Sequence, residues 1–276
     1  MIVVFPFEHF AIIDQGIGFY TERRGKDRIM DDTLILLGVI GMFASFMGTL
    51  AGGQAIITLP GMILLGIPIH TSIATNKFSN GIACLTSILY LWKKGTLEIK
   101  TIYTYISIAF VGGGLGACIT ASISDKALNI IALCLLVLAL FVAFKQKQWI
   151  EKAQTQYSKS WRLRNILLFL ISVYDGGFGP GSSTFSILHF MNQGNTYVKA
   201  AQLTRVLIFG SCLGAFIIFY KAGVVHWPYA IAMALGSALG SQIGILALPH
   251  IPFRVAQSLM ALILFFLVGQ MIFKLV

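Results

Sequence analysis

Charged residues are scarce in this chain of 276 residues: they make up 11% of it, while 57% of the residues are hydrophobic. An ordinary soluble domain carries about 25% charged residues, so the chain lacks the polar surface that a water-soluble globule needs. Its long runs of Leu, Ile, Val and Phe exclude a disordered chain. The composition therefore predicts an all-α polytopic membrane protein embedded in a lipid bilayer.

Acidic residues are the scarcer charged type, because 10 Asp and Glu stand against 20 Lys and Arg, for a net charge of +10. No basic stripe has aromatic residues interleaved with it, so we expect no nucleic-acid partner. The excess positive charge instead fits loops that face the cytoplasm beside anionic lipid.

Catalytic and metal-binding patterns are also lacking. The four cysteines, Cys84, Cys118, Cys134 and Cys212, lie in apolar stretches without a CxxC spacing, so we expect no disulfide frame, metal site or cofactor. Ser182 or Ser183 beside His189 could pair a nucleophile with a base, but no GxSxG elbow is present. We therefore expect that the protein is not an enzyme.

Long apolar runs are what the chain has in abundance. A helix that crosses a hydrocarbon core of about 30 Å needs about 20 apolar residues, and runs of that length occupy residues 72–92, 101–123, 127–144, 203–220, 228–248 and 253–274. Two further stretches contain helix breakers. Ala51-Gly52-Gly53-Gln54 separates 34–50 from 55–69, and Gly179-Pro180-Gly181-Ser182 separates 165–178 from 183–191. The pattern predicts long helices and two broken or re-entrant segments.

A basic, polar segment at 145–164 divides the chain. By the positive-inside rule it is a cytoplasmic loop of a protein in the inner (plasma) membrane. It separates a first transmembrane repeat, 32–144, from a second, 165–276. Residues 1–31 mix aromatic with acidic residues and have no signal-peptide pattern, so they predict an interfacial segment.

A constant shift along the sequence superposes the two halves as internal repeats. An offset of about 128 residues places Gly53 on Gly181, Cys84 on Cys212 and Lys77 on Arg205, although overall identity is low. The orientation of the halves depends on whether the first broken pair counts as an even or an odd number of crossings. An odd count puts the basic cluster at 23–28 on the cytoplasmic side. The charge rule favours that choice, which gives about eight crossings and two halves in the same orientation.

The two interrupted stretches are candidate binding sites. A helix that begins inside the bilayer presents free N–H groups and a positive dipole end, which can bind an anion. We therefore assign Gly52, Gly53 and Gln54 to substrate binding, together with Gly179, Gly181, Ser182 and Ser183. The alternative is close helix packing through small residues, or a simple loop between crossings.

Three charged residues fall within apolar segments. A cation at the bilayer centre costs at least about 2.5–3.5 kcal/mol, so Lys77 with Asn76, and Arg205 with Thr204, are further candidates for binding an anion. Alternatively, each cation reaches the interface from a helix end or pairs with Asp175. Burial of Asp175 favours the protonated acid and a proton-carrying role, whereas a nearby Arg205 favours the carboxylate and a structural pair. The sequence leaves both open.

Several short motifs resemble those of one family. In the first half Gly52-Gly53 precedes Thr58-Leu59-Pro60, Gly66-Ile67-Pro68 and Ala74-Thr75-Asn76-Lys77, and in the second half the residues from Tyr174 to Gly181 precede Leu203-Thr204-Arg205. Over about residues 34–274 the chain resembles the TauE/SafE-type sulfite and sulfonate exporters, also called the toluene sulfonate uptake permease family.

This resemblance implies a duplicated permease that moves small sulfur-containing anions, mostly outward, with coupling to an ion gradient. Gln54, Ser182-Ser183 and Ile208 depart from the usual motifs, so sulfite itself does not follow from it. The resulting hypothesis is a secondary transporter that exports sulfite, a sulfonate or a related oxyanion by alternating access, with Asp175 as the proton-coupling residue. The alternatives are a passive anion channel and a permease for a non-sulfur small organic anion. The sequence does not predict an oligomeric state.

Overall fold

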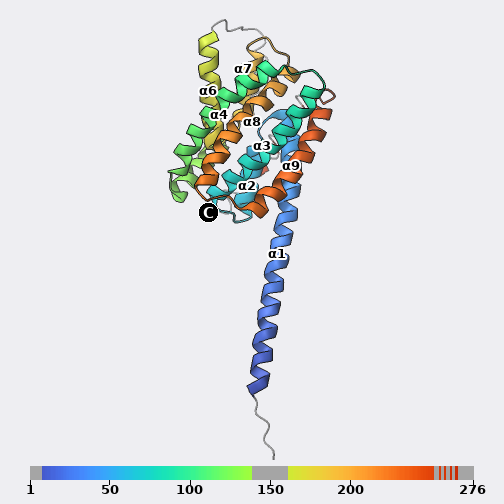
Figure 1. The fold of residues 1–276 in the computed structure, drawn as a ribbon, viewed down its shortest axis with the longest axis vertical. Helices are drawn as coiled ribbons and strands as arrows, with labels where there is room; N and C mark the ends of the chain where they lie inside the picture. Colours follow the sequence, from blue (N-terminus) through green and yellow to red (C-terminus); the bar gives the residue numbers. More distant parts are fainter. Residues whose placement is uncertain are drawn as a thin grey trace, which may run out of the picture.

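The computed structural model describes residues 8–138 and 161–251 and the single positions 255, 258, 262, 265 and 266, with side chains from residue 30 onward and, after the gap, from 165 onward. Within these residues the chain is helical, with turns and no strands. The elements are α1 (Glu8–Ala51), α2 (Gln54–Leu64), α3 (Ile69–Lys93), α4 (Ile99–Ala121), a helix at 125–138, α6 (Trp161–Gly177), α7 (Ser182–Met191), α8 (Tyr197–Lys221) and α9 (Trp227–Ala247) (Figure 1). The predicted all-α class is confirmed.

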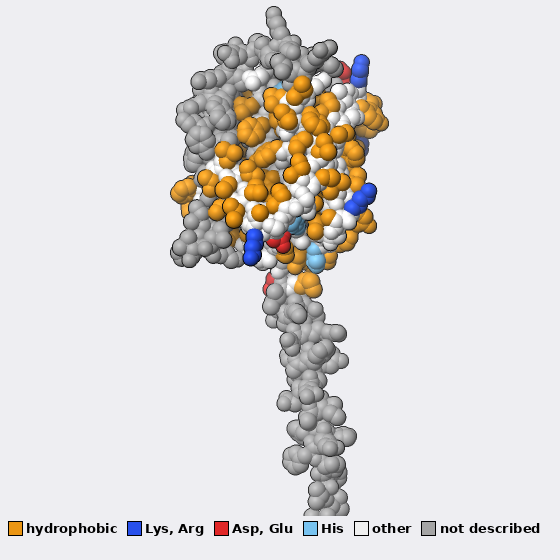
Figure 2. Space-filling view, turned by 90° about the vertical axis from the view of Figure 1, so that its left-hand side faces the viewer, with side chains coloured by type: hydrophobic (Ala, Val, Ile, Leu, Met, Phe, Trp, Pro, Cys, Tyr) orange, Lys and Arg blue, Asp and Glu red, His pale blue; other side chains and the backbone are white. Residues whose placement is uncertain are grey.

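Four of the described helices are long and apolar enough to cross a membrane: the Met30–Ala51 part of α1, and α4, α8 and α9. Large apolar side chains on their outer faces are exposed, among them Leu115 of α4 and Leu239 of α9. Figure 2 shows hydrophobic side chains over most of the described face of the body. This surface is suited to lipid and not to water. The count of about eight crossings stays a prediction.

Helices of the two halves interleave. α4 packs on α6 and α8, and α9 packs on α1 and α3. Glycines permit the close approach: a Cβ on Gly116 would collide with the Val173 carbonyl oxygen of α6, and one on Gly240 with the Met42 carbonyl oxygen of α1. Small residues bring helices into contact where lipid supplies no hydrophobic drive. The first half therefore packs its α4 against helices of the second half, and the second half packs its α9 against helices of the first.

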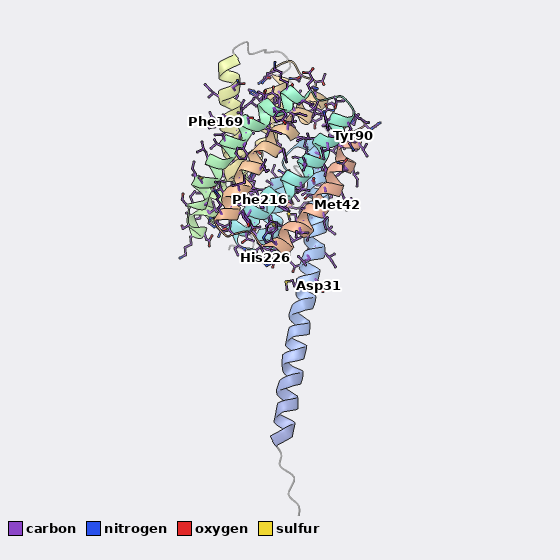
Figure 3. All side chains as sticks on the ribbon, viewed as in Figure 1. Asp31, Met42, Tyr90, Phe169, Phe216 and His226 are labelled. Atoms are coloured by element: carbon purple, nitrogen blue, oxygen red, sulfur yellow. The ribbon has the colours of Figure 1, made fainter. Side chains whose placement is uncertain are left out.

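Helices at corresponding places in the two halves run in opposite directions. On α3 and α8, Phe78 lies beside Phe216 and Cys84 beside Arg205, so these helices are antiparallel. α4 runs parallel to α8, because Ile106 meets Gly210 and Phe110 meets Gly214. Tyr90 at the end of α3 and His226 before α9 mark the two ends of the body (Figure 3). The expectation that the halves share one orientation is wrong.

The reason lies in the first helix break. Gly48 lies against Gln54, and Ile40 against Gly61, so α2 turns back along α1. The chain enters and leaves by the same end of the body, which makes the crossing count of this pair even (Figure 1). The basic cluster at 23–28 consequently lies at the end opposite the α3–α4 turn. The positive-inside rule is a statistical tendency of loop composition. Here the reversal of the backbone at Gly52 and Gly53 determines at which end of the body the N-terminal basic cluster lies.

The spacing of the elements matches the offset found in the sequence. α2 and α7 begin at Gln54 and Ser182, the same shift that places Gly53 on Gly181. α3 and α8 begin at Ile69 and Tyr197, and α4 and α9 at Ile99 and Trp227, with the same separation.

The predicted domain limits stay predictions. α1 is one continuous helix through residues 31 and 32, and Asp31 lies where it leaves the body (Figure 3). The first seven residues lie outside the described part of the chain. So does most of the basic loop predicted at 145–164, and so do the end of the run at 127–144 and most of the run at 253–274.

Candidate functional site

The two helix breaks have the same backbone geometry. Gly53 precedes α2 with φ 93°, and Gly181 precedes α7 with φ 82°, both in the left-handed region. Only glycine adopts this conformation without steric cost. Neither residue supplies a side-chain cap to the helix that follows it. Two short helices therefore begin inside the body without a side-chain cap, although the N–H groups of Ser182, Thr184 and Ile56 bond to backbone carbonyls of the breaks.

The two breaks touch one another. A Cβ added to Gly52 would lie 3.1 Å from the Cβ of Ser183, so the first break packs directly against the start of α7. Because α2 and α7 belong to opposite halves, this contact places both helix N-termini in the same region. Gln54 and Ser182, the first residues of the two helices, are both buried there.

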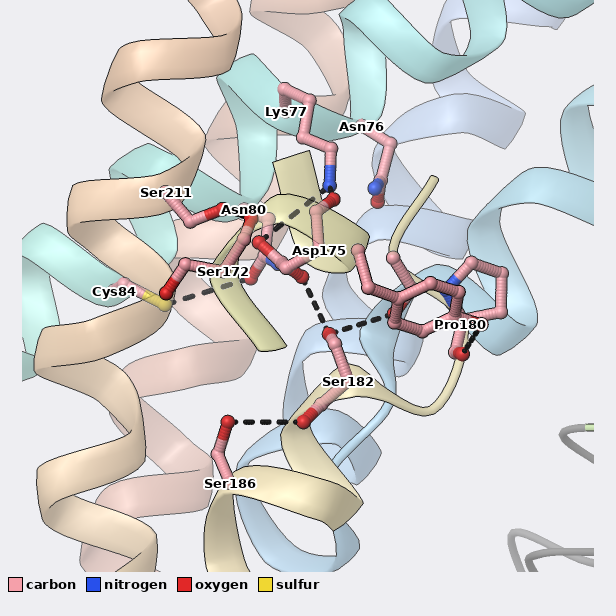
Figure 4. Close-up of polar contacts among 12 residues, drawn as sticks. Asn76, Lys77, Asn80, Cys84, Ser172, Asp175, Pro180, Ser182, Ser186 and Ser211 are labelled. Carbon is pink, nitrogen blue, oxygen red and sulfur yellow. Dashed lines mark hydrogen bonds and ion pairs between the residues drawn. The ribbon is translucent and has the colours of Figure 1, made fainter. Parts of the chain in front are cut away.

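Lys77 and Asp175 form an ion pair beside the second break. Lys77 Nζ lies 3.7 Å from Asp175 Oδ2 and also donates to the Asp175 carbonyl oxygen. The hydroxyl of Ser182 donates to Asp175 Oδ1 at 2.5 Å and to the Gly179 carbonyl oxygen at 2.8 Å (Figure 4). Lys77 is 1% exposed and Asp175 2%. The carboxylate thus joins α3, α6 and the first residue of α7.

This geometry decides between the alternatives for Lys77. The side chain does not extend to the interface but is buried, in the third turn of α3. It pairs with Asp175, which is one of the interpretations that the sequence leaves open. The other proposed pair, Arg205 with Asp175, is not among the ion pairs of the described residues.

Arg205 is the second buried cation. It lies on α8, is 5% exposed, and donates from Nη1 to Cys84 Sγ on α3 at 3.6 Å. Its Nη2 has no hydrogen-bond partner among the described residues. A thiol is a weak acceptor, so the Arg205 guanidinium is poorly satisfied for a charge inside a membrane protein.

Other buried polar atoms on α2, α3 and α8 are also without partners among the described residues. Asn76 accepts from Thr58 Oγ1 at 2.7 Å, and Gln54 donates to Ser237 Oγ at 3.1 Å. Within the described part of the chain, the buried atoms left without a hydrogen bond include Gln54 Oε1, Thr75 Oγ1, Asn76 Nδ2 and Thr204 Oγ1. Unsatisfied polar groups at membrane depth are costly. Their concentration on α2, α3 and α8 marks a region suited to a polar ligand or water.

The structure brings together many of the residues selected from the sequence. Lys77, Asp175, Gly179 and Ser182 form one cluster, and Gly52 meets Ser183. Sequence reasoning missed Cys84 and Ser237. The apolar surroundings of Cys84 conceal its contact with a cation, and its coincidence with Cys212 in the superposed halves is the available signal. Ser237 lies within the apolar run of α9, and no pattern in the sequence indicates its contact with Gln54.

The motifs around these residues can now be compared with known proteins. The chain matches the family described as sulfite exporter TauE/SafE over residues 37–271. It belongs to that family. The resemblance seen in the sequence is thereby confirmed, and the match includes both helix breaks and all three buried charges.

Relatives of this TauE/SafE protein are named as transporters. It is 32% identical to a probable membrane transporter protein, ORF9, of Sinorhizobium sp, over 76% of this chain and 81% of that one. A probable membrane transporter protein of Haemophilus influenzae is 31% identical over 77% and 84% of the two chains. The probable membrane transporter protein YfcA of Escherichia coli K12 is 26% identical over 76% and 80%. The protein is a multi-pass membrane transporter of the TauE/SafE family.

Proposed function

We propose that this protein is a secondary transporter that exports a small sulfur-containing oxyanion, such as sulfite or a sulfonate, across the plasma membrane. The family description supports the substrate class. The proposed site comprises the residues at the two breaks and beside the two cations: Gly52, Gly53, Gln54, Asn76, Lys77, Gly179, Gly181, Ser182, Ser183, Thr204 and Arg205.

The observation that carries this proposal is the meeting of two helix N-termini beside the buried Lys77–Asp175 pair, with a second buried cation, Arg205, on α8, which packs on α3 and α7. Helix N-termini present N–H groups and a partial positive charge to an anion. Among the described residues, Arg205 adds an unpaired positive charge, and Lys77 adds an ammonium group paired with Asp175, in a buried region where electrostatic attraction is strong. Such an arrangement of discontinuous helices at membrane depth is typical of substrate sites in secondary transporters.

We further propose that the two halves are inverted repeats. The equal spacing of their elements and the antiparallel course of α3 and α8 support this relationship. In inverted-repeat transporters, one half or bundle moves against the other around a central site. Alternating access in this protein would then expose the region of the breaks first to one side and then to the other.

Asp175 is the proposed proton-coupling group. Its carboxylate pairs with Lys77 of α3 and accepts from Ser182 of α7, and Tyr174 precedes it in α6. Protonation of Asp175 would release Lys77 from the ion pair, which links the charge of the site to pH.

Burial supports a carrier over an open channel. A continuous pore through the site would wet both cations, whereas Lys77 is 1% exposed and Arg205 5%.

We propose that the loop at 145–164 is cytoplasmic. It precedes α6, which begins at the same end as α4, and Lys93, Lys94 and Lys100 lie at that end as well.

A thermal-shift screen of the purified protein tests the substrate class. A ligand that binds only the folded state raises the apparent stability. Sulfite, methanesulfonate, thiosulfate, sulfate and acetate should be compared at equal ionic strength, with sodium chloride as the control. We expect sulfite or methanesulfonate to raise the melting temperature most. A larger shift with acetate would favour a non-sulfur organic anion, and no shift with any anion would contradict the proposed site.

A further inference from the structure

We infer that Arg205 is the cation that holds the transported anion, that Lys77 is neutralised by Asp175, and that the site therefore takes a singly charged oxyanion. This inference rests on the proposed function and narrows it. It assigns different tasks to two cations that occupy equivalent positions in the superposed halves.

The charges in the interior do not balance. Among the described residues, the buried Lys, Arg, Asp and Glu side chains are Lys77, Arg205 and Asp175. The ion pair of Lys77 with Asp175 leaves this region with one net positive charge, on Arg205. An uncompensated charge at membrane depth is costly, and a single bound monoanion would remove that cost.

The two cations also differ in their contacts. Lys77 has a carboxylate and a backbone carbonyl as acceptors. Within the described part of the chain Arg205 has only the Cys84 thiol, and Nη2 has no acceptor. The side chain of Arg205 is more than nine-tenths buried, so bulk water does not replace the missing acceptor. The guanidinium is therefore prepared for a ligand, whereas the ammonium group of Lys77 is already occupied.

The sequence explains why only one cation has a carboxylate. Asp175 lies on α6 in the turn before the second break. The residue at the equivalent position of the first half, on α1, is Met47, which is fully buried and apolar. The acidic residues of the described side chains of α1 are Asp31 and Asp32, both exposed at its outer end. The half that would supply a carboxylate to Arg205 supplies a thioether instead.

The chemistry of the guanidinium narrows the ligand. Its planar arrangement of donors matches two oxygens of one acid group, and such bidentate pairs are stronger and more specific than contacts to a point charge. The neighbouring Thr204 hydroxyl is also buried and, among the described residues, without a partner. A monovalent group with two or more oxygens, as in a sulfonate or hydrogen sulfite, fits these donors. Chloride is a single atom and has no pair of oxygens for the guanidinium, and sulfate carries two negative charges where the site has one positive charge to balance.

Isothermal titration of the purified protein in detergent tests the assignment, with methanesulfonate as the monovalent probe and sulfate and chloride as comparisons. We expect methanesulfonate to bind the wild type more tightly than either. Arg205→Met should weaken its binding about 30-fold or more, because a buried charge partner is lost. Arg205→Lys should weaken it about tenfold through loss of the planar donors.

The variant that separates the two cations is the double substitution Lys77→Met with Asp175→Asn, which removes a neutral pair. We expect it to weaken methanesulfonate binding less than tenfold. Lys126→Met, which removes an exposed cation at the end of the body, is the matched control, and a thermal melt reports folding.

If the double variant loses binding while Arg205→Met keeps it, the inference is wrong although the proposed function stands. Tighter binding of sulfate than methanesulfonate contradicts the single charge. If no anion binds the wild type, both are wrong.

Discussion

Lys77 of α3 and Asp175 of α6, which stand 98 residues apart in the chain, form a buried ion pair of 3.7 Å between the two halves of the molecule. The same carboxylate accepts from Ser182 at the start of α7. One acidic group therefore connects both halves and the second helix break. Its loss affects charge, packing and the geometry of the break together.

Removal of one partner from this pair should cost more than removal of both. Lys77→Met leaves a buried carboxylate without a counter-charge, and breaking such a pair costs about 3–5 kcal/mol. The double substitution Lys77→Met with Asp175→Asn removes both charges, so it should restore much of the lost stability. Thermal unfolding in detergent measures the difference. Equal melting temperatures for the single and the double variant would show that the pair is not energetically coupled.

Substitution of Asp175 should also change the response of transport to pH. Asparagine keeps the shape of the side chain but cannot bind or release a proton. We expect Asp175→Asn to flatten the pH dependence of transport into proteoliposomes, measured with methanesulfonate because this anion, unlike sulfite, keeps the same charge around neutral pH. Glu98→Gln, at an exposed position in the α3–α4 turn, is the control. A wild-type pH profile in Asp175→Asn would remove Asp175 from proton coupling.

The left-handed glycine before α7 should be needed for transport. Gly181→Ala places a Cβ on a residue with positive φ. Left-handed backbone costs a residue with a Cβ about 1–2 kcal/mol, so we expect slower transport together with a lower melting temperature. Gly95→Ala introduces the same type of strain in the α3–α4 turn, with open space around it. That control should lose stability but retain transport. Equal loss of transport in both variants would show that strain alone explains the effect.

The opposite orientation of the halves predicts which turns face which side. Glu98 and Ala222 follow α3 and α8, whose courses are antiparallel. With the loop at 145–164 in the cytoplasm, a membrane-impermeant maleimide should label Ala222→Cys in intact cells. Glu98→Cys should be labelled only after permeabilisation. Labelling of both positions from one side would contradict the inverted arrangement, and exchange of the two results would reverse the orientation.

Much of the architecture was predictable because it follows from composition and from helix breakers. Apolar runs predicted the helices, and Gly53 and Gly181 predicted the interruptions, since both residues adopt a backbone conformation that other residues avoid. The direction of the halves was not predictable. It depends on the reversal of α2 along α1, and a charge count cannot distinguish that reversal from a crossing.

The candidate site was predictable in its residue types but not in its pairing. Lys77, Asp175 and Arg205 stood out because charge is rare in apolar segments. The sequence left both cations open as partners of Asp175, and only the packing of α3 against the other half selects Lys77. The contact of Arg205 with Cys84 depends on the antiparallel course of α3 and α8, which no local pattern encodes.

The proposed anion site at the helix breaks and the buried cations underlies the transport predictions. Transport of labelled sulfite by purified protein in proteoliposomes tests it most directly, with Lys126→Ala as the control for folding and insertion. We predict that the wild type and Lys126→Ala transport, and that Arg205→Ala and Lys77→Ala do not. Arg205→Ala loses the anion's charge partner, and Lys77→Ala leaves the repelling carboxylate of Asp175 unpaired. Full transport by both variants would contradict a central anion site.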